Sequence, residues 1–219
     1  MAAAKEKAQR TQCANNCKQI GLATHMYVNE GALDNMPDPN WGQTARAGGA
    51  RWLAGWLYAL GPGNAVLDLW TPPFNADPVR AHETGLLWTY LKNISIYQCP
   101  LDKTNSSNFR LRANKFSTSV EDGAIVGYRK ASASLRQSEF QADAYMLWEP
   151  NDVPQSYNDA ASRPYDTEGL GTCHGKMGGV VLTCSGSVEF VKYAKWATLA
   201  ASPDKNRFWC NPGTDSGHE

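Results

Sequence analysis

The stretch CANNCKQIGLATHMYVNEG, from Cys13 to Gly31, decides how we expect this chain to fold. Its small and apolar residues recur at steps of three and four, which places them along one face of an α-helix. These residues are Cys13, Cys17, Ile20, Ala23 or Thr24, and Tyr27. Asn15, Lys18 and Gln19 lie off that face. The helix therefore has one face to bury, and the rest of the chain has to bury it.

The flanks of this stretch suggest how the chain is divided. Residues 2–12 are rich in alanine and charge and have few apolar side chains, so we expect the exposed end of a helix that continues upstream. Gly31 and the proline shortly after it mark the other end, because proline cannot continue a helix. We expect an N-terminal helix over residues 1–30 and a globular head over residues 31–219 that packs on residues 13–30.

The composition excludes some classes of protein. The chain has 219 residues and a formal net charge of zero, from 21 basic and 21 acidic residues. No overall field draws it to nucleic acid or to an anionic membrane, and we expect no nucleic-acid partner. No run of eighteen apolar residues and no signal peptide occur. Nineteen glycines, twelve prolines and eight tryptophans indicate a loop-rich protein with aromatic loops.

The remaining periodic segments predict an α+β fold, in which a long helix lies on an antiparallel sheet with long irregular insertions. The pattern predicts strands over residues 94–100, 144–148, 179–183 and 187–193, and a short helix over residues 52–60. The run at 144–148, AYMLW, is apolar throughout, which is typical of a buried strand.

The cysteines predict two disulfides. A turn at Gly178–Gly179 would place Cys173 directly opposite Cys184 on a hairpin, within disulfide reach. Cys99 and Cys210 each precede proline or Asn-Pro in extended segments and form the second predicted pair. Such bridges would place the domain outside the cytoplasm. The alternative interpretation is a set of buried thiols, since thiols are among the most buried side chains. No regular Cys/His spacing predicts a zinc site.

Two end motifs resemble a known bacterial family. The N-terminal KEKAQRTQCANNCKQIGLATHMYVNEG resembles the segment that follows the transmembrane helix of prepilin-like proteins. HGKMGGVVLTCSGSVEF resembles the processing-associated C-terminal motif, in which a His precedes an Asp-Gly pair; here Ser185-Gly186 replaces it. YQCPLDK, LWEPND and GLGTCHGK resemble further blocks of the type II secretion pseudopilin-like proteins of planctomycetes and verrucomicrobia.

This resemblance implies a pilin-like fold and a non-catalytic structural or binding role, as a subunit of a type II secretion or type IV pilus-like envelope apparatus. Its partners would be other pseudopilin subunits, joined through an N-terminal helix upstream, and a polysaccharide or secreted substrate. Family members begin with a leader and a Phe-Thr-Leu-Ile-Glu run that this sequence lacks, so we expect the soluble periplasmic part of a longer chain. The full-length form would be anchored to the inner membrane, in the periplasm or at the cell surface.

One irregular block is rich in oxygen ligands and resembles in composition the calcium-holding loop of major pseudopilins. Its candidate ligands are Asp152, Asn158, Asp159, Asp166 and Glu168. Calcium takes six to eight oxygens from flexible loops, so clustered carboxylates and amides suit it. The alternative interpretation is a solvated acidic loop without an ion.

An enzymatic alternative rests on carboxylates and tryptophans. Glu149, at the end of a buried strand, and Glu168 could serve as the paired carboxylates of a glycoside hydrolase. The aromatic residues that would bind the glycan are Trp41, Trp52, Trp56 and Trp70. The competing interpretation is that Glu149 bonds a nearby backbone amide and that the tryptophans fill the core. No GxSxG elbow or phosphate-binding glycine loop occurs.

Overall fold

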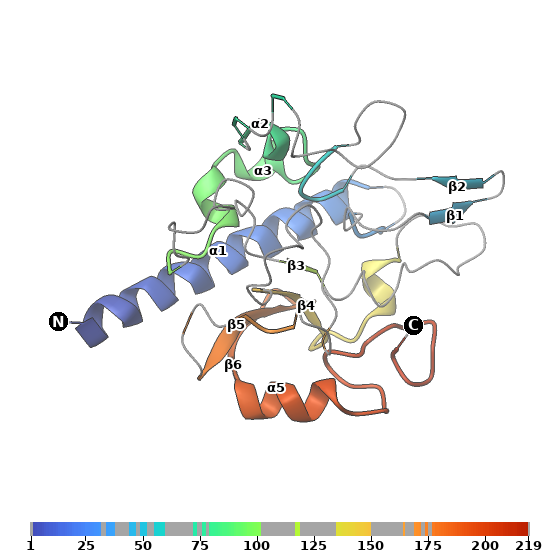
Figure 1. Ribbon diagram of the computed structural model, residues 1–219. Helices are drawn as coiled ribbons and strands as arrows, with labels where there is room; N and C mark the ends of the chain where they lie inside the picture. The colour runs from blue at the N-terminus through green and yellow to red at the C-terminus, as the bar shows by residue number, and fades with distance from the viewer. Residues whose placement is uncertain are drawn as a thin grey trace.

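The protein is an α+β fold with its N-terminal helix packed on an antiparallel sheet, as the sequence predicts (Figure 1). The computed structural model describes residues 2–31, 34–37, 44–46, 49–51, 55–59, 72–73, 76–77, 79–101, 117–118, 135–149, 164, 169–171, 174 and 177–218. The elements, in chain order, are α1 (Ala2–Glu30), β1 (Thr44–Arg46), β2 (Gly49–Arg51), α2 (Val79–His82), α3 (Trp88–Leu91), the 3-10 helix η2 (Ile94–Tyr97), β3 (Ser117–Thr118), the 3-10 helix η4 (Gln137–Glu139), β4 (Tyr145–Trp148), β5 (Gly178–Thr183), β6 (Val188–Lys192) and α5 (Tyr193–Ala200).

Helix α1 buries the face that its periodicity predicts. The predicted residues that are buried are Cys13, Cys17, Ile20, Ala23 and Thr24. Tyr27 is only partly buried, and Val28 is buried in the last turn. The helix ends at Glu30, where the Gly31 amide donates to the Tyr27 carbonyl at 3.1 Å. Within the described residues no helix, α1 included, combines the length and the apolar character needed to cross a membrane.

The main sheet has the order β3-β4-β5-β6, and all its neighbours are antiparallel. β5 and β6 form a hairpin around Cys184, Ser185 and Gly186, as the strand pattern predicts. The turn predicted at Gly178–Gly179 is wrong, because both glycines lie within β5, opposite Lys192 and Val191. Close approach between chain segments, rather than a turn, explains these two glycines: a Cβ on Gly178 would lie 2.0 Å from the Val191 carbonyl oxygen.

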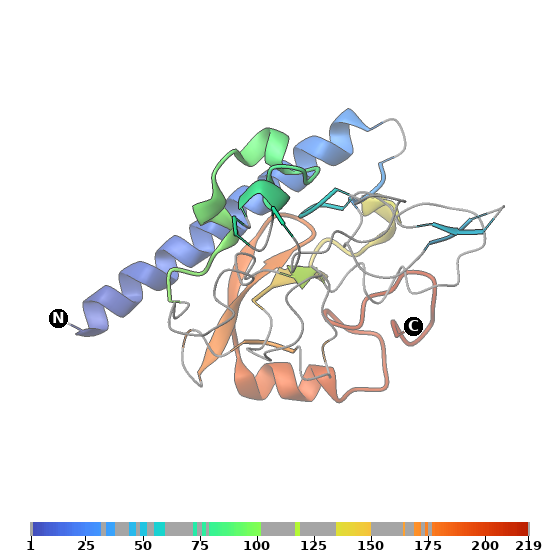
Figure 2. The ribbon, with the colours of Figure 1, turned by 45° about the horizontal axis from the view of Figure 1, so that its top comes forward.

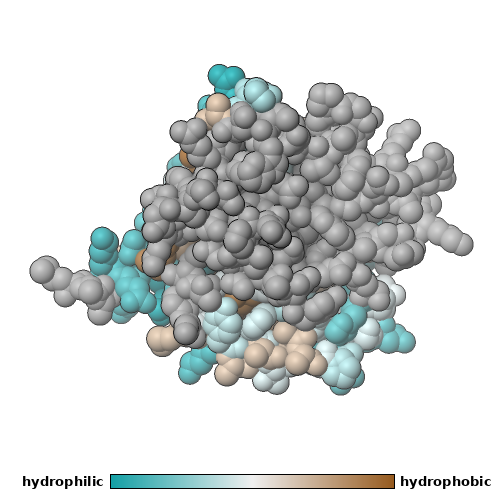
Figure 3. All heavy atoms as spheres, viewed as in Figure 1, coloured by the Kyte–Doolittle hydropathy of each residue, from teal (hydrophilic) through white to brown (hydrophobic). Residues whose placement is uncertain are grey.

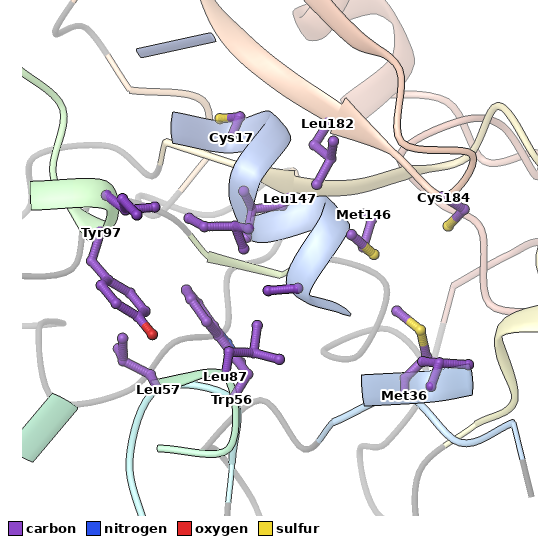
Figure 4. Packing of buried hydrophobic residues seen from close by; sticks show 14 of the residues in the cluster. Cys17, Met36, Trp56, Leu57, Leu87, Tyr97, Met146, Leu147, Leu182 and Cys184 are labelled. Atoms are coloured by element: carbon purple, nitrogen blue, oxygen red, sulfur yellow. The ribbon is translucent and has the colours of Figure 1, made fainter. Parts of the chain in front are cut away.

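Both faces of the sheet are covered, α1 lying on one side and α5 on the other (Figures 1 and 2). Val180 and Leu182 of β5 belong to the core cluster beneath α1, in which Leu182 is paired with Leu147 of β4 (Figure 4). Val181 belongs to the second cluster, with partners from β4, β6 and the C-terminal segment: Tyr145, Trp148, Val191 and Phe208. This double coverage explains why β4 and β5 are apolar at consecutive positions.

Two predicted elements differ from the structure. Residues 94–97 form the 3-10 helix η2 instead of a strand, because the Asn93 side chain caps the turn by accepting from the Ser95 amide at 3.0 Å. The described part of the predicted helix 52–60, residues 55–59, is not helical. Its Gly55 carbonyl accepts from the amide of Leu86 at 3.0 Å, so tertiary pairing replaces the helix.

Arg207 fastens the C-terminal segment to the sheet. Its guanidinium donates to both carboxylate oxygens of Glu189, at 2.6 and 3.0 Å, and lies 4.1 Å from the centre of the Tyr145 ring. The Tyr145 hydroxyl donates to the same carboxylate at 3.1 Å. The hydrogen bonds from Arg207, followed by that from Tyr145, hold the pKa of Glu189 below its ordinary value of 4.5.

We expect this ion pair to make stability depend on pH. Because the pKa of Glu189 is lowered on folding, its contribution is present at neutral pH and is lost as the pH falls below about 4.5. The Glu189 side chain is 37% exposed, so solvent screening limits the contribution to about 1 kcal/mol or less. In thermal unfolding measured from pH 7 to pH 3, the melting temperature of wild type should exceed that of Glu189→Gln at pH 7. This difference in melting temperature should disappear at low pH. A gap of constant size would contradict the assignment.

Candidate functional site

Four buried side chains bring metal-ligand atoms together beneath α1. They are Cys13 of α1, Cys99 after η2, Glu149 at the end of β4 and His174 before β5. Their sulfur, nitrogen and oxygen atoms all lie within 4.8 Å of one another. Cys13 and Glu149 are 0% exposed, His174 1% and Cys99 2%, so the cluster is closed to solvent.

Side chains of α1 hold the Cys99 segment against the helix. Two donors bind three backbone carbonyls: Gln9 binds Pro100 at 3.2 Å, and Asn16 binds Ser95 and Gln98, each at 3.0 Å. Asn16 is itself 6% exposed, and such a buried amide is costly unless it is hydrogen-bonded. These bonds flank Cys13 on the helix and Cys99 on the loop. They place the two cysteines on facing segments.

Glu149 and His174 meet at the other side of the cluster. The Glu149 carbonyl accepts from the Gly171 amide at 2.7 Å, which ties the end of β4 to the chain that leads to His174. The side chains approach to 2.9 Å between Glu149 Oε2 and His174 Nε2. This contact is short but poorly aligned, and no well-formed hydrogen bond in the described structure reaches either Glu149 oxygen or His174 Nδ1. A buried polar atom in that state needs an explanation.

The sulfurs of the cluster are buried thiols with a donor nearby. The Leu101 amide donates to Cys99 Sγ at 3.4 Å. The pKa of Cys13 is raised well above its ordinary value, chiefly by its hydrogen bond with Cys17. Burial raises the pKa of Cys17, which lies one turn along the same helix. As the protein stands, both helix thiols are therefore protonated near neutral pH.

The geometry suits ligation better than nucleophilic catalysis. A Cys-His-Glu triad needs one ring nitrogen on the thiol and the other on the carboxylate. Here the single nitrogen His174 Nε2 faces both Cys99 Sγ, at 3.8 Å, and Glu149 Oε2, at 2.9 Å. All four donors converge on one point, and their burial leaves no access for a substrate. This is the arrangement of a closed metal site. The spacing of cysteines and histidines along the sequence does not reveal this group, because four separate segments supply its four side chains.

The glycosidase residues are not arranged for catalysis. Glu149 is fully buried, so it cannot touch a glycosidic bond, and Glu168 lies outside the described residues. Trp56, predicted to bind a glycan, is 1% exposed and stacks on Tyr97 with ring centres 6.1 Å apart. Its place in the core corrects that prediction (Figure 4). Trp41, Trp52 and Trp70 lie outside the described residues.

The predicted calcium ligands cannot be placed. Asp152, Asn158, Asp159, Asp166 and Glu168 all lie outside the described residues.

The two predicted disulfides are wrong. Cys99, Cys184 and Cys210 are buried thiols in the structure, and Cys173 lies outside the described residues. Cys99 faces His174 instead of Cys210. Cys184 lies in the β5–β6 turn, where burial and then the neighbouring Cys210 raise its pKa. Burial also raises the pKa of Cys210 to about 12. The alternative interpretation, buried thiols, describes these three residues.

A surface groove lies beside the C-terminal motif. Its volume is about 530 Å³, and it is lined by Asn15, Lys18, Gln19, Leu22 and His25 of α1 and by Ser185 and Gly186 of the β5–β6 turn. The side-chain nitrogen of Gln137, Nε2, lies 2.7 Å from His25 Nδ1 and donates to the Cys184 carbonyl at 3.1 Å. Gln137 thus links α1 to the β5–β6 turn. The Ser185 hydroxyl is 2.9 Å from that of Thr183. Ser185 thus bonds locally within the β5–β6 turn.

Comparison with known proteins shows one relationship. No curated protein and no solved structure matches this chain significantly. A family model described as "Protein of unknown function (DUF1559)" matches residues 2–163, which is most of the chain and includes α1, Cys13, Cys99 and Glu149. The chain therefore belongs to this family, DUF1559.

Proposed function

We propose that this protein is a pseudopilin-like subunit of a type II secretion or type IV pilus-like apparatus in the cell envelope. The observation that carries the proposal is the division of α1 into two parts. Its second half is docked on the sheet from Cys13 onward, whereas residues 4–8 are exposed and the N-terminal end projects beyond the head (Figures 1 and 2). A helix held rigidly at one end presents its other end to neighbouring subunits.

The surface of α1 supports assembly through this helix. The projecting end carries hydrophilic side chains (Figure 3). Farther along, two large apolar side chains face solvent one turn apart: Leu22 is 62% exposed and Met26 42%. Leu22 also lines the groove beside the β5–β6 turn. Exposed apolar side chains beside a hollow are typical of a surface that packs against another protein.

The proposal requires no catalysis and places the protein on the periplasmic side of the inner membrane, with other pseudopilins as its partners. The glycoside hydrolase alternative has no support from Glu149, which is enclosed in the core. A helix docked on a sheet also fits the N-terminal motif that resembles prepilin-like proteins.

Site-specific photocrosslinking in the source cell tests this proposal. A photoreactive amino acid would replace Lys7, on the projecting end of α1, or Leu22, beside the groove. We expect crosslinks from these positions to further copies of the chain or to other pseudopilins in the membrane fraction, because Lys7 and Leu22 both face solvent on α1. Immunoblots of that fraction would measure them.

Ala197 is the matched control. It is exposed on α5, on the opposite face of the sheet, and should give no crosslink to a pseudopilin. If the protein is recovered from the membrane fraction without crosslinks from either α1 position, or if Ala197 crosslinks equally well, assembly through α1 is wrong.

A further inference from the structure

We propose that Cys13, Cys99, Glu149 and His174 hold one zinc ion that fastens α1 to the head. The site does not depend on the proposed pseudopilin role, because the evidence for it lies within the core of a single chain.

The spacing of the donors fits the ion. A tetrahedral zinc ion with bonds of about 2.0–2.3 Å keeps its ligand atoms about 3.3–3.8 Å apart. The donor atoms here lie within 4.8 Å of one another, and the distances from His174 Nε2 to Glu149 Oε2 and Cys99 Sγ, 2.9 and 3.8 Å, bracket the required range. Side-chain shifts of up to about 1 Å bring all four donors into range.

The unpartnered atoms point to a cation. A fully buried carboxylate needs a positive partner or several hydrogen bonds, and both Glu149 oxygens lack well-aligned bonds to the described residues. His174 Nε2 is aimed at the oxygen and sulfur together, so its proton could satisfy only one of them. A cation at the centre of the four donors satisfies all of them at once.

The donor types select zinc. Two sulfurs, one imidazole and one carboxylate form a mixed soft and borderline set, which tetrahedral zinc accepts and which calcium and magnesium, ligated by oxygen, do not. The amide that donates to Cys99 Sγ, from Leu101, supplies the hydrogen bond to a ligand sulfur that commonly supports such sites. With every donor 0–2% exposed, no position remains open for a substrate, so the ion has a structural role.

The site joins four segments that, among the described residues, meet through side-chain packing and a few hydrogen bonds. Cys13 belongs to α1, Cys99 to the segment held by Asn16, Glu149 to the end of β4, and His174 to the chain before β5. A ligand that binds only the folded state stabilises it by mass action. At a free zinc concentration one hundred times the dissociation constant, the melting temperature should rise by about 5–10 °C.

The test is metal analysis of the purified, chelator-treated and reduced chain after addition of zinc. We expect one zinc per chain after dialysis and the rise in melting temperature given above. Cobalt in place of zinc should give the intense visible bands of a tetrahedral ion and a thiolate charge-transfer band that corresponds to two sulfurs. Cys99→Ser and Glu149→Gln should weaken zinc binding at least about tenfold, since even supporting residues of a metal site cost that much.

Cys17→Ser is the matched control. Cys17 is a fully buried thiol one turn from Cys13 and outside the group of four, so its loss should leave zinc stoichiometry unchanged. Circular dichroism checks that each variant folds, and the cobalt spectrum of wild type decides the matter if a variant does not. Failure of wild type to retain zinc, a cobalt spectrum without thiolate bands, or equal loss of zinc in Cys17→Ser and Cys99→Ser overturns the proposal. None of these results bears on assembly through α1.

Discussion

Leu182→Ala should lower the free energy of unfolding by about 2–5 kcal/mol, as expected for a large-to-small change in a well-packed core. Leu182 is 0% exposed on the face of β5 beneath α1. A Cβ on Gly21 of the helix would lie only 2.9 Å from its Cδ1, so helix and strand are in close contact there. The cavity left by alanine lies in the helix–sheet interface, where neither element can collapse into it. Chemical denaturation followed by tryptophan fluorescence measures the loss.

Leu22→Ala provides the control with the same change of side chain. Leu22 neighbours Gly21 but is 62% exposed, on the outer face of α1. Exposed substitutions usually change stability by no more than about 0.5 kcal/mol, and we expect that here. Equal losses in the two variants would mean that the predicted face of α1 does not pack on the sheet.

Gly178→Ala should lower the free energy of unfolding by about 2–6 kcal/mol, from backbone strain and overpacking together. Gly178 has a φ of +155°, which side chains rarely adopt. Its added methyl group would meet the Val191 carbonyl oxygen at 2.0 Å, and a backbone atom in a paired strand cannot move aside. The β5–β6 pairing would have to open at this end. Thermal and urea unfolding measure the effect.

Gly31→Ala is the corresponding control outside the sheet. An added Cβ there would come no closer than 3.4 Å to the Val28 carbonyl oxygen, and φ is not in the left-handed region. Alanine restricts the unfolded chain more than glycine does, so we expect a change within about 1 kcal/mol, in the stabilising direction. A loss as large as that of Gly178→Ala would show that the contact with Val191 is not the cause.

The local sequence pattern predicts those helices and strands in which buried residues recur at a regular spacing. The three-and-four spacing of Cys13, Cys17 and Ile20 correctly predicted the buried face of α1. The apolar runs before Glu149 and after Gly178 predicted β4 and β5. In these segments, one physical requirement, an apolar face against a core, acts on many residues at once.

The errors arose where one distant contact decides the structure. Gly178 and Gly179 look like a turn, but they are small because Val191 and Leu170 approach them from other segments. Residues 94–97 alternate like a strand, yet Asn93 caps them as a 3-10 helix. The predicted disulfides are wrong for the same reason, because the neighbour of Cys99 is His174, from a distant segment.

The candidate metal centre shows this limit most clearly. Cys13 was correctly assigned to the buried stripe of the helix, but that pattern says nothing about what its sulfur faces. Glu149 has the position of an ordinary strand-end carboxylate, and nothing in the sequence around His174 indicates that its ring faces Glu149 and Cys99. Only the topology, which brings the end of β4 and the chain before β5 beneath α1, places the donors together.

The docking of α1 has a consequence for biosynthesis. The helix is the first described element to leave the ribosome, yet its main partner is β5, which is made near the end of the chain. The Asn16 bonds alone close loops of 79 and 82 residues. Since non-local contacts form only after their loop-closure entropy has been overcome, the apolar stripe has to wait for translation of the hairpin. A chaperone that shelters this stripe meanwhile would determine how much of the newly made chain escapes aggregation.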